Sequence, residues 1–171
     1  STRWSARAAT AVIAISAATA GDLHRFYATP LGKVHVVHEA APAPRAVSAE
    51  AVVAGRARYG LAAPYALFVG TLQPRKNLAR LGAAYAALVQ AGQADFDLVL
   101  AGGAGWLSGD LLAALDALSL GPQLHRLGFV PDAELPALYA GARLFCFPSL
   151  YEGFGLPVLA AQSYGAPVMT A

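Results

Sequence analysis

Charged residues are scarce in this chain. They make up 13% of its 171 residues, whereas hydrophobic residues make up 57%. The formal net charge is +2 at pH 7, and no basic run is longer than the "PRK" at 74–76. Because a nucleic-acid groove needs clustered cations to neutralise phosphates, no nucleic-acid partner is expected. The hydrophobic excess is largely alanine, which suits buried helices and does not indicate disorder.

Cysteine is also scarce. Cys146 is the only one, which excludes a disulfide framework and a cysteine-based metal site. It lies in the apolar run "RLFCF" and is predicted to be a buried strand thiol, not a nucleophile. The four histidines show no i, i+4 pairing with an acidic partner on one helix, so no metal site is expected from them.

The first twenty residues allow two interpretations. Arginines precede an apolar run that ends in small residues, which is the pattern of a signal peptide. The apolar part is too short to span a membrane. The same residues also predict a strand at 11–16 followed by a helix with Ser16 as its N-cap, and we favour this second interpretation.

The rest of the chain alternates short β-rich runs with helical segments. Strands are predicted at 33–38, 65–70, 97–102, 124–129, 143–147 and 166–171. Helices are predicted at about 48–59 with Ser48 as N-cap, after Asn77, through 110–118, through 132–142 and after "EGFG". Apolar strands alternating with helices indicate a parallel sheet covered on both faces, and right-handed crossovers then give an α/β, Rossmann-like doubly wound domain.

One segment is the best candidate for a linker. The run "EAAPAPRAVS" at 39–48 is broken three times by prolines and small residues. This linker divides the chain into 1–40, a linker with a helix at 41–64, and a Rossmann-like domain at 65–171.

Four loops are the candidates for a ligand site. Parallel sheets bind ligands outside the carboxyl ends of their strands. The loops "GTLQPRKN", "AGGAGW", "GFVPD" and "PSLYEGFGL" all follow predicted strands, and all carry glycine or proline. They share one edge of the sheet, which is a stronger indication than any single loop.

The first loop carries two adjacent cations. Arg75 and Lys76 stand beside the helix that Asn77 is predicted to cap, after Gly70 at the strand end. A planar guanidinium and a compact ammonium beside a helix N-terminus make a site for phosphate oxygens. A solvated loop with a capping asparagine fits the same residues equally well.

The second loop resembles part of a dinucleotide fingerprint. The spacing G-x-G-x-x-G is not met, and no ribose-binding acid follows about twenty residues later. Gly102 and Gly103 are instead expected to permit a tight turn close to a ligand. A nicotinamide oxidoreductase remains an alternative at this point.

The third loop, "LGFVPDAEL", ends a predicted strand and begins a helix. Asp132 is predicted to cap that helix. The structural interpretation, a turn and a cap, competes with a functional one, in which a base or ribose lies against the backbone of Phe129 and Val130.

The fourth loop, "YEGFGLP", is the most informative. Glycines let the backbone run close to a ligand, and the amides of Phe154, Gly155 and Leu156 can point outward at the start of a helix, where they would hold an anion. Glu152 would repel a phosphate, so it is expected to face a neutral group with hydroxyls. A sugar and a phosphate on one loop indicate a nucleotide-sugar.

The motifs "GTLQPRKNL" and "EGFGLP" together resemble the donor-binding half of a family-4 retaining glycosyltransferase of the GT-B architecture, in its mannosyltransferase-like branch. The resemblance runs from about residue 9 to 171. It implies transfer of a hexose from a nucleoside-diphosphate sugar to a glycan or lipid-linked acceptor in the synthesis of surface polysaccharides. It implies that residues 1–40 end an N-terminal acceptor-side Rossmann-like domain and that residues 65–171 are a truncated donor-binding Rossmann-like domain. It also implies that the chain is a fragment with little or no transferase activity by itself.

The resemblance assigns roles to particular residues. Lys76 would neutralise the donor diphosphate with Arg75 beside it, and Glu152 would hydrogen-bond the transferred sugar. Thr71 stands where many members have arginine, so Arg75 would supply part of that charge. The two arguments together give a donor-binding set of Gly70, Thr71, Gly102, Gly103, Phe129, Val130, Gly153, Phe154, Gly155 and Leu156.

One position departs from the family. A second glutamate normally holds the ribose hydroxyls eight residues after the first, and here that position is Ala160. Losing a charged hydrogen-bond acceptor costs roughly 1.5–3 kcal/mol. A non-catalytic nucleotide-binding module is therefore an alternative, as is another GT-B enzyme such as a sugar-nucleotide epimerase.

The resemblance further implies no metal and no cofactor beyond the nucleotide-sugar substrate. It implies a cytoplasmic location, with peripheral association at the inner face of the membrane as an option for the intact enzyme.

Overall fold

The computed structural model describes residues 2–41, 43 and 46–171, which form two compact units. The first unit holds Ser1–Ala40 together with Glu152–Leu156, and the second holds Ala41–Tyr151 together with Pro157–Ala171. Three residues of the predicted linker (42, 44 and 45) lie outside the described part of the chain, and its other residues belong to no helix or strand.

The first unit contains a small parallel sheet with helices around it. Its elements are α1 (Thr2–Ala8), β1 (Val12–Ala14), α2 (Ala17–Tyr27), the 3₁₀ turn η1 (Leu31–Lys33) and β2 (Val34–Val36). Strand β1 pairs in parallel with β2. Ser16 caps α2 as predicted, because its Oγ accepts a hydrogen bond from the backbone N of Thr19 at 3.0 Å. The helix α1 was not predicted from the sequence.

The second unit contains the predicted sheet. Five parallel strands lie in the order β5-β4-β3-β6-β7. They are β3 (Tyr65–Val69), β4 (Asp97–Ala101), β5 (Leu124–Gly128), β6 (Leu144–Phe147) and β7 (Val168–Thr170). The α/β fold class and the parallel sheet are thus confirmed.

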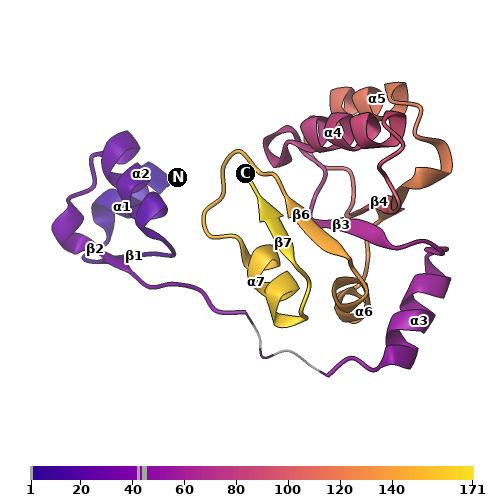
Figure 1. Cartoon of the computed structure of the whole chain (residues 1–171). Coiled ribbons are helices and arrows are strands. Elements are labelled where there is room, and N and C mark those ends of the chain that lie inside the picture. The colour runs from indigo at the N-terminus through magenta and orange to yellow at the C-terminus, as the bar shows by residue number, and fades with distance from the viewer. Residues whose placement is uncertain (1, 42, 44–45) are drawn as a thin grey trace. The chain divides into compact units, whose positions relative to one another are not determined.

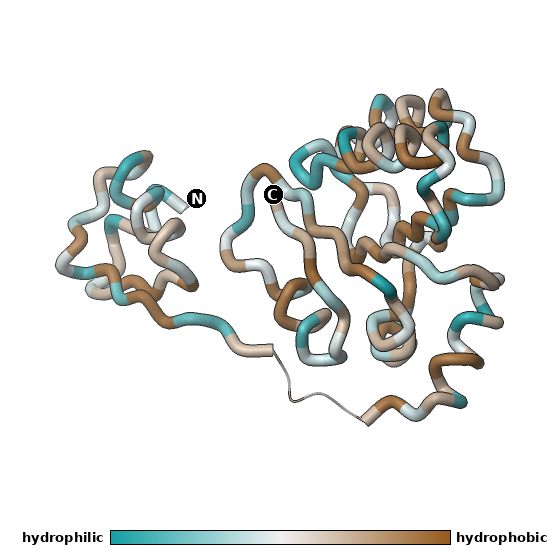
Figure 2. Tube along the Cα trace, in the orientation of Figure 1, coloured by the Kyte–Doolittle hydropathy of each residue, from teal (hydrophilic) through white to brown (hydrophobic). Residues whose placement is uncertain are grey.

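Helices cover both faces of this sheet (Figure 1). In that view α4 and α5 lie on one side of the strands, and α6 and α7 lie on the other. The helices are α3 (Ala49–Arg58), α4 (Leu78–Gln90), α5 (Gly109–Ala117), α6 (Leu135–Ala140) and α7 (Leu156–Ser163), with 3₁₀ turns η2 (Pro74–Lys76) and η3 (Gly121–Gln123). Most residues of α4 and α5 are apolar with a few hydrophilic ones among them (Figure 2), and the buried residues of α4 recur at helical spacing, as in a helix with one buried face.

The central strands form the core. Tyr65, Leu67 and Phe68 on β3 are fully buried, as is Phe145 on β6. Helices α4 and α5 approach closely at Gly82, where an added Cβ would lie 2.6 Å from the Leu115 side chain. Strands that are buried on both faces read as continuous apolar runs, and this is why the sequence alone located them.

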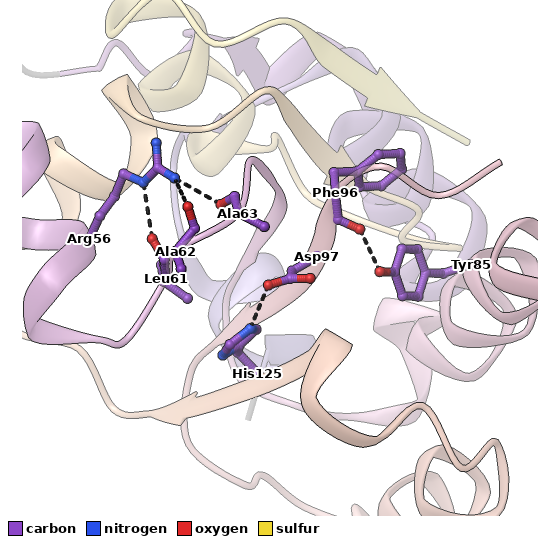
Figure 3. A network of polar contacts seen from close by, with 8 residues as sticks. All are labelled: Arg56, Leu61, Ala62, Ala63, Tyr85, Phe96, Asp97 and His125. Atoms are coloured by element: carbon purple, nitrogen blue, oxygen red, sulfur yellow. Dashed lines mark hydrogen bonds and ion pairs between the residues drawn. The ribbon is translucent and has the colours of Figure 1, made fainter. Parts of the chain in front are cut away.

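Polar contacts hold the amino ends of the strands (Figure 3). His125 Nε2 lies 2.9 Å from Asp97 Oδ2, which joins β5 to β4. The Tyr85 hydroxyl donates to the Phe96 carbonyl at 2.5 Å, and Arg56 donates to the carbonyls of residues 61–63. These groups serve the fold, because they lie at the end of the sheet opposite the ligand-binding edge of parallel sheets.

Only some of the predicted helix caps form. Ser48 caps α3, since its Oγ accepts from Ala51 N at 3.2 Å. Asn77 precedes α4 but has a left-handed backbone with φ of 58° and makes no side-chain cap. Asp132 does not cap α6, because Glu134 N donates to Pro131 O in a turn and the helix begins only at Leu135. Asn77 thus holds the predicted N-cap position of α4 but makes no capping bond with its side chain, and the cap predicted at Asp132 was wrong.

Cys146 is buried on β6 with 2% of its surface exposed, as predicted. Burial raises the pKa of its thiol to about 11. We expect no reaction with a thiol reagent at about pH 8 in the folded protein, because the reactive thiolate is both rare and inaccessible. Stoichiometric labelling should appear in denaturant. Rapid labelling of the native chain would contradict this burial.

Candidate functional site

The site is built at a switch point of the sheet. Strands β3 and β6 are neighbours, but the chain leaves β3 toward β4 on one side and leaves β6 toward β7 on the other. In such sheets a crevice opens outside the carboxyl ends of the two strands. The loop after β3 and the loop after β6 both leave the sheet at this point.

Lys76 is a buried cation at this point. Only 6% of its surface is exposed. Its Nζ lies 4.9 Å from the centroid of the Phe147 ring at the end of β6, and its Cε lies 3.8 Å from the position of a Cβ added to Gly70. A buried ammonium is costly, and the ring face offsets only part of that cost. The arrangement keeps a positive charge beside the ends of both strands, where an anion would be stabilised.

Arg75 joins the two loops. Its Nη1 donates to the Tyr151 carbonyl at 2.8 Å, and Leu150 N donates to the Arg75 carbonyl at 2.9 Å. The contacts hold the segment after β3 against the segment after β6. Its expected contact with phosphate stays a prediction, while the observed contacts give Arg75 a positioning role.

A pocket lies beside the strand ends on the β4 and β5 side. Its volume is about 200 Å³. It is lined by Val69, Gly70, Thr71, Ala101, Gly102, Gly103, Phe129, Val130, Asp132 and Leu135. The structure thus brings together six residues predicted from three separate loops: Gly70, Thr71, Gly102, Gly103, Phe129 and Val130.

Four lining residues were missed. Val69 and Ala101 are the last residues of their strands. Each directly precedes a glycine that was predicted to bind the donor, and this position could have indicated that they line the pocket. Asp132 was noticed but interpreted as a helix cap, and Leu135 was assigned to a helix interior. No local pattern showed that the turn after β5 folds back over the strand ends.

Gly102 allows the loops to pack this closely. It has a φ of 153°, and an added Cβ would lie 2.0 Å from the Gly70 carbonyl oxygen. Hydrogen bonds continue beyond the strands here, from Gly70 N to Ala101 O at 2.9 Å and from Leu72 N to Gly103 O at 2.9 Å. This is the tight turn predicted for the glycine-rich loop, and only glycine fits at position 102.

The walls of the pocket suit a flat ring. Most lining groups are glycine backbone or aliphatic side chains. The Phe129 ring is 79% exposed, so the core does not use it. Exposed aromatic faces and peptide planes are common platforms for nucleobases. The volume is below the usual 300–1,000 Å³ of whole-ligand pockets, so it fits part of a larger ligand.

The remaining predicted residues belong to the first unit. This unit contains the predicted residues Glu152, Gly153, Phe154, Gly155 and Leu156. Within that unit the Thr19 hydroxyl lies 3.4 Å from the Gly153 carbonyl, and an added Cβ on Gly153 would lie 3.1 Å from the Ile15 side chain. Gly153 therefore packs closely against Ile15, while the approach to a ligand that is expected of this loop stays a prediction.

Ala160 lies on α7, half-buried against the core of the second unit. The described residues contain no group of three or more His, Cys, Asp and Glu side chains that could hold a metal ion. Among them no helix is both long and apolar enough to cross a membrane.

Comparison with protein families shows the family of this chain. A model described as glycosyl transferases group 1 matches residues 58–171, and the chain belongs to this family. It is 45% identical over 105 residues to the O-antigen chain mannosyltransferase B of Escherichia coli, covering 61% of this chain and 28% of that protein. It is 38% identical over 125 residues to the serotype-specific mannosyltransferase WbdA of the same species, covering 71% and 15%.

A further relative is the D-inositol 3-phosphate glycosyltransferase of Streptomyces scabiei. It is 34% identical over 176 residues, covering 96% of this chain and 39% of that protein. The chain therefore spans well under half the length of these three relatives.

Solved structures confirm the fold. Anabaena HepE in complex with UDP-glucose superposes with a TM-score of 0.84 at 22% identity, covering 99% of this chain and 46% of that one. WaaG, a glycosyltransferase of lipopolysaccharide biosynthesis, gives a TM-score of 0.75 at 20% identity, covering 92% and 43%. These likenesses confirm the predicted α/β fold of the GT-B glycosyltransferases.

Proposed function

We propose that this chain binds the donor in a retaining glycosyltransferase. The reaction would move a hexose, with mannose the first candidate, from a nucleoside-diphosphate sugar to a glycan or lipid-linked acceptor. Two relatives described as mannosyltransferases, one of them of an O-antigen chain, support the sugar and the pathway. A structural neighbour in complex with UDP-glucose supports the donor class.

One observation carries this proposal. Gly70 lines the pocket and also lies against the stem of buried Lys76. A nucleotide whose base occupies the pocket would therefore extend its diphosphate past Gly70 toward the ammonium. A base-sized hollow next to a fixed cation is the arrangement that a nucleoside diphosphate requires.

The proposed roles of these residues follow from the negative charge that develops on the leaving diphosphate. Transfer breaks the bond between the anomeric carbon and a phosphate oxygen, and the electrons of that bond leave with the diphosphate. Lys76 would stabilise this leaving group, and fixed charges aimed at developing charge are often the largest catalytic effect. Glu152 would orient the sugar hydroxyls. No metal ion and no cofactor has a role in this proposal.

A second candidate function is a non-catalytic nucleotide-binding module. The observation that favours it is Ala160, which offers no carboxylate to the ribose hydroxyls and packs against the core instead. In that case the nucleotide would bind without any transfer of sugar.

Calorimetric titration of the 171-residue chain with GDP-mannose, UDP-glucose and ADP-glucose tests the first step. We expect saturable binding of at least one donor. Since the 171 residues by themselves are expected to transfer little or nothing, the two candidates are separated by incubating the full-length protein that contains them with radiolabelled donor and a glycan acceptor: a transferase moves the sugar, whereas a module only binds the donor. Absence of binding to every donor would overturn the proposed function.

A further inference from the structure

We propose that Thr19 is a positioning residue for the donor sugar. Its hydroxyl fixes the peptide between Gly153 and Phe154, so that the Phe154 N–H is presented to a sugar hydroxyl. The inference rests on the proposed function, because it concerns how the loop that would contact the donor sugar is held. All residues that carry it belong to the first unit.

Thr19 stands in a short chain of hydrogen bonds at the start of α2. Its backbone N donates to Ser16 Oγ at 3.0 Å, and the Ser16 hydroxyl donates to Thr19 Oγ1 at 3.1 Å. The Thr19 hydroxyl lies 3.4 Å from the Gly153 carbonyl oxygen. A carbonyl only accepts, so Thr19 must donate its single proton to Gly153 while it accepts from Ser16. The three groups therefore leave one consistent direction for the chain, toward Gly153.

The peptide after Gly153 is held at both ends. An added Cβ on Gly153 would lie 3.1 Å from Ile15 Cδ1 and 3.8 Å from Thr19 Oγ1, so the backbone packs directly on the first turn of α2 and the residue before its cap. At the other end, the Phe154 ring lies against the His38 ring with 5.8 Å between centroids. These contacts restrict the rotation of the peptide, and the Thr19 hydroxyl is the polar group that sets its direction.

The direction of the carbonyl decides the direction of the next amide. A trans peptide is planar, and its C=O and N–H point to opposite sides. Since the Gly153 carbonyl is turned toward Thr19, the Phe154 N–H points away from α2. Among the described residues no group accepts a hydrogen bond from this N–H. The loop thus carries a donor of fixed direction that the fold does not use.

The partner that suits this N–H is a neutral oxygen. Glu152 lies two residues before Phe154, and its carboxylate would repel a phosphate held at the same turn. A sugar hydroxyl is uncharged, and it can accept from the N–H while it donates to a carboxylate. A hexose with adjacent hydroxyls therefore satisfies both groups, whereas a free nucleoside diphosphate lacks that hexose.

Calorimetry on Thr19→Val tests the inference. The 171-residue chain is titrated with GDP-mannose, UDP-glucose and ADP-glucose, and with GDP, UDP and ADP. Valine keeps the size of the side chain and removes the hydroxyl. We expect the affinity for the sugar nucleotide that binds to fall about three- to fivefold, and that for its free nucleotide to change less than about twofold. The effect is modest because 3.4 Å is longer than the usual distance of about 2.7–2.8 Å.

Two further variants separate positioning from folding. Thr19→Ser keeps the hydroxyl, so it should restore the ratio of the two affinities to that of the unsubstituted chain. Thr10→Val is the matched control, because Thr10 is an exposed threonine of the same unit, between α1 and β1, whose side chain makes no hydrogen bond to the described residues. It should leave the ratio unchanged. A purely structural role of Thr19 would weaken the binding of both ligands equally.

A measurement without substitution at Thr19 addresses the amide itself. Selective ¹⁵N labelling of the seven phenylalanines gives few resonances, and Phe154→Leu identifies the one that belongs to Phe154. We expect the Phe154 amide proton resonance to move when the sugar nucleotide is added and to stay in place with the free nucleotide.

The results distinguish this inference from the proposed function. Binding of a sugar nucleotide with an unchanged affinity ratio in Thr19→Val, or an equal movement of the Phe154 resonance with both ligands, would overturn the inference and leave the proposed function standing. If no sugar nucleotide bound to the unsubstituted chain, both would be overturned.

Discussion

Replacing Lys76 with methionine is expected to weaken the binding of nucleoside diphosphates roughly ten- to hundredfold. A hydrogen bond to a charged group contributes about 1.5–3 kcal/mol, and each 1.4 kcal/mol is a factor of about ten in affinity. Methionine keeps an unbranched apolar stem beside Gly70 and Phe147, so the packing of this 6% exposed side chain is largely preserved. The loss should therefore report the missing charge and not a misfolded loop.

The measurement is calorimetric titration of the variant beside Arg80→Met. Arg80 is an exposed cation in the first turn of α4, so its replacement removes the same net charge near the same helix end without touching the pocket. We expect nearly unchanged affinity in that control and similar unfolding temperatures in both variants. If Lys76→Met and the control bound equally well, Lys76 would have no role in holding the diphosphate.

Gly102→Ala is expected to lower the unfolding temperature by about 10 °C. The added Cβ would lie 2.0 Å from the Gly70 carbonyl oxygen, and the φ of 153° is one that side-chain-bearing residues rarely adopt. Strain of this kind and a displaced backbone cost on the order of 3–4 kcal/mol, and 1 kcal/mol corresponds to about 2–4 °C for a domain of this size. Nucleotide binding should fall as well, since the displaced carbonyl belongs to the pocket edge.

Gly103→Ala is the matched control for this change. Gly103 is the next residue and also lines the pocket, but an added Cβ there meets nothing within 4 Å. Thermal unfolding followed by circular dichroism should place this variant within about 2 °C of the unsubstituted chain. Equal unfolding temperatures for the two alanine variants would show that the turn relaxes without cost, contrary to its geometry.

Sequence reasoning succeeded where local pattern and global fold agree. The buried strands read as apolar runs, and the glycine and proline loops after them were assigned to one edge of the sheet. Six residues from three of these loops line the pocket. The rule that succeeded is topological, since parallel strands bring all their carboxyl ends to one edge whatever the loop sequences are.

Prediction from the sequence failed for helix caps, because the backbone conformation of the preceding turn decides whether a side chain can cap a helix. Asn77 and Asp132 have typical capping side chains, but Asn77 takes a left-handed backbone after a 3₁₀ turn and α6 starts three residues after Asp132. A cap requires extended backbone dihedrals as well as a suitable oxygen. The helix α1 was missed because its residues were weighed as a signal-like segment and not as a helix.

By itself, the sequence determined the order of strands and helices, the parallel sheet, the burial of Cys146 and the family. Only the tertiary structure decided that Lys76 is buried against Phe147, that Arg75 bonds to Tyr151 and that Asp132 lines the pocket. Element order follows from local periodicity, which every short stretch of chain carries. The environment of a loop side chain depends on residues from other loops about 20 to 75 positions away, because it is created when the strands align.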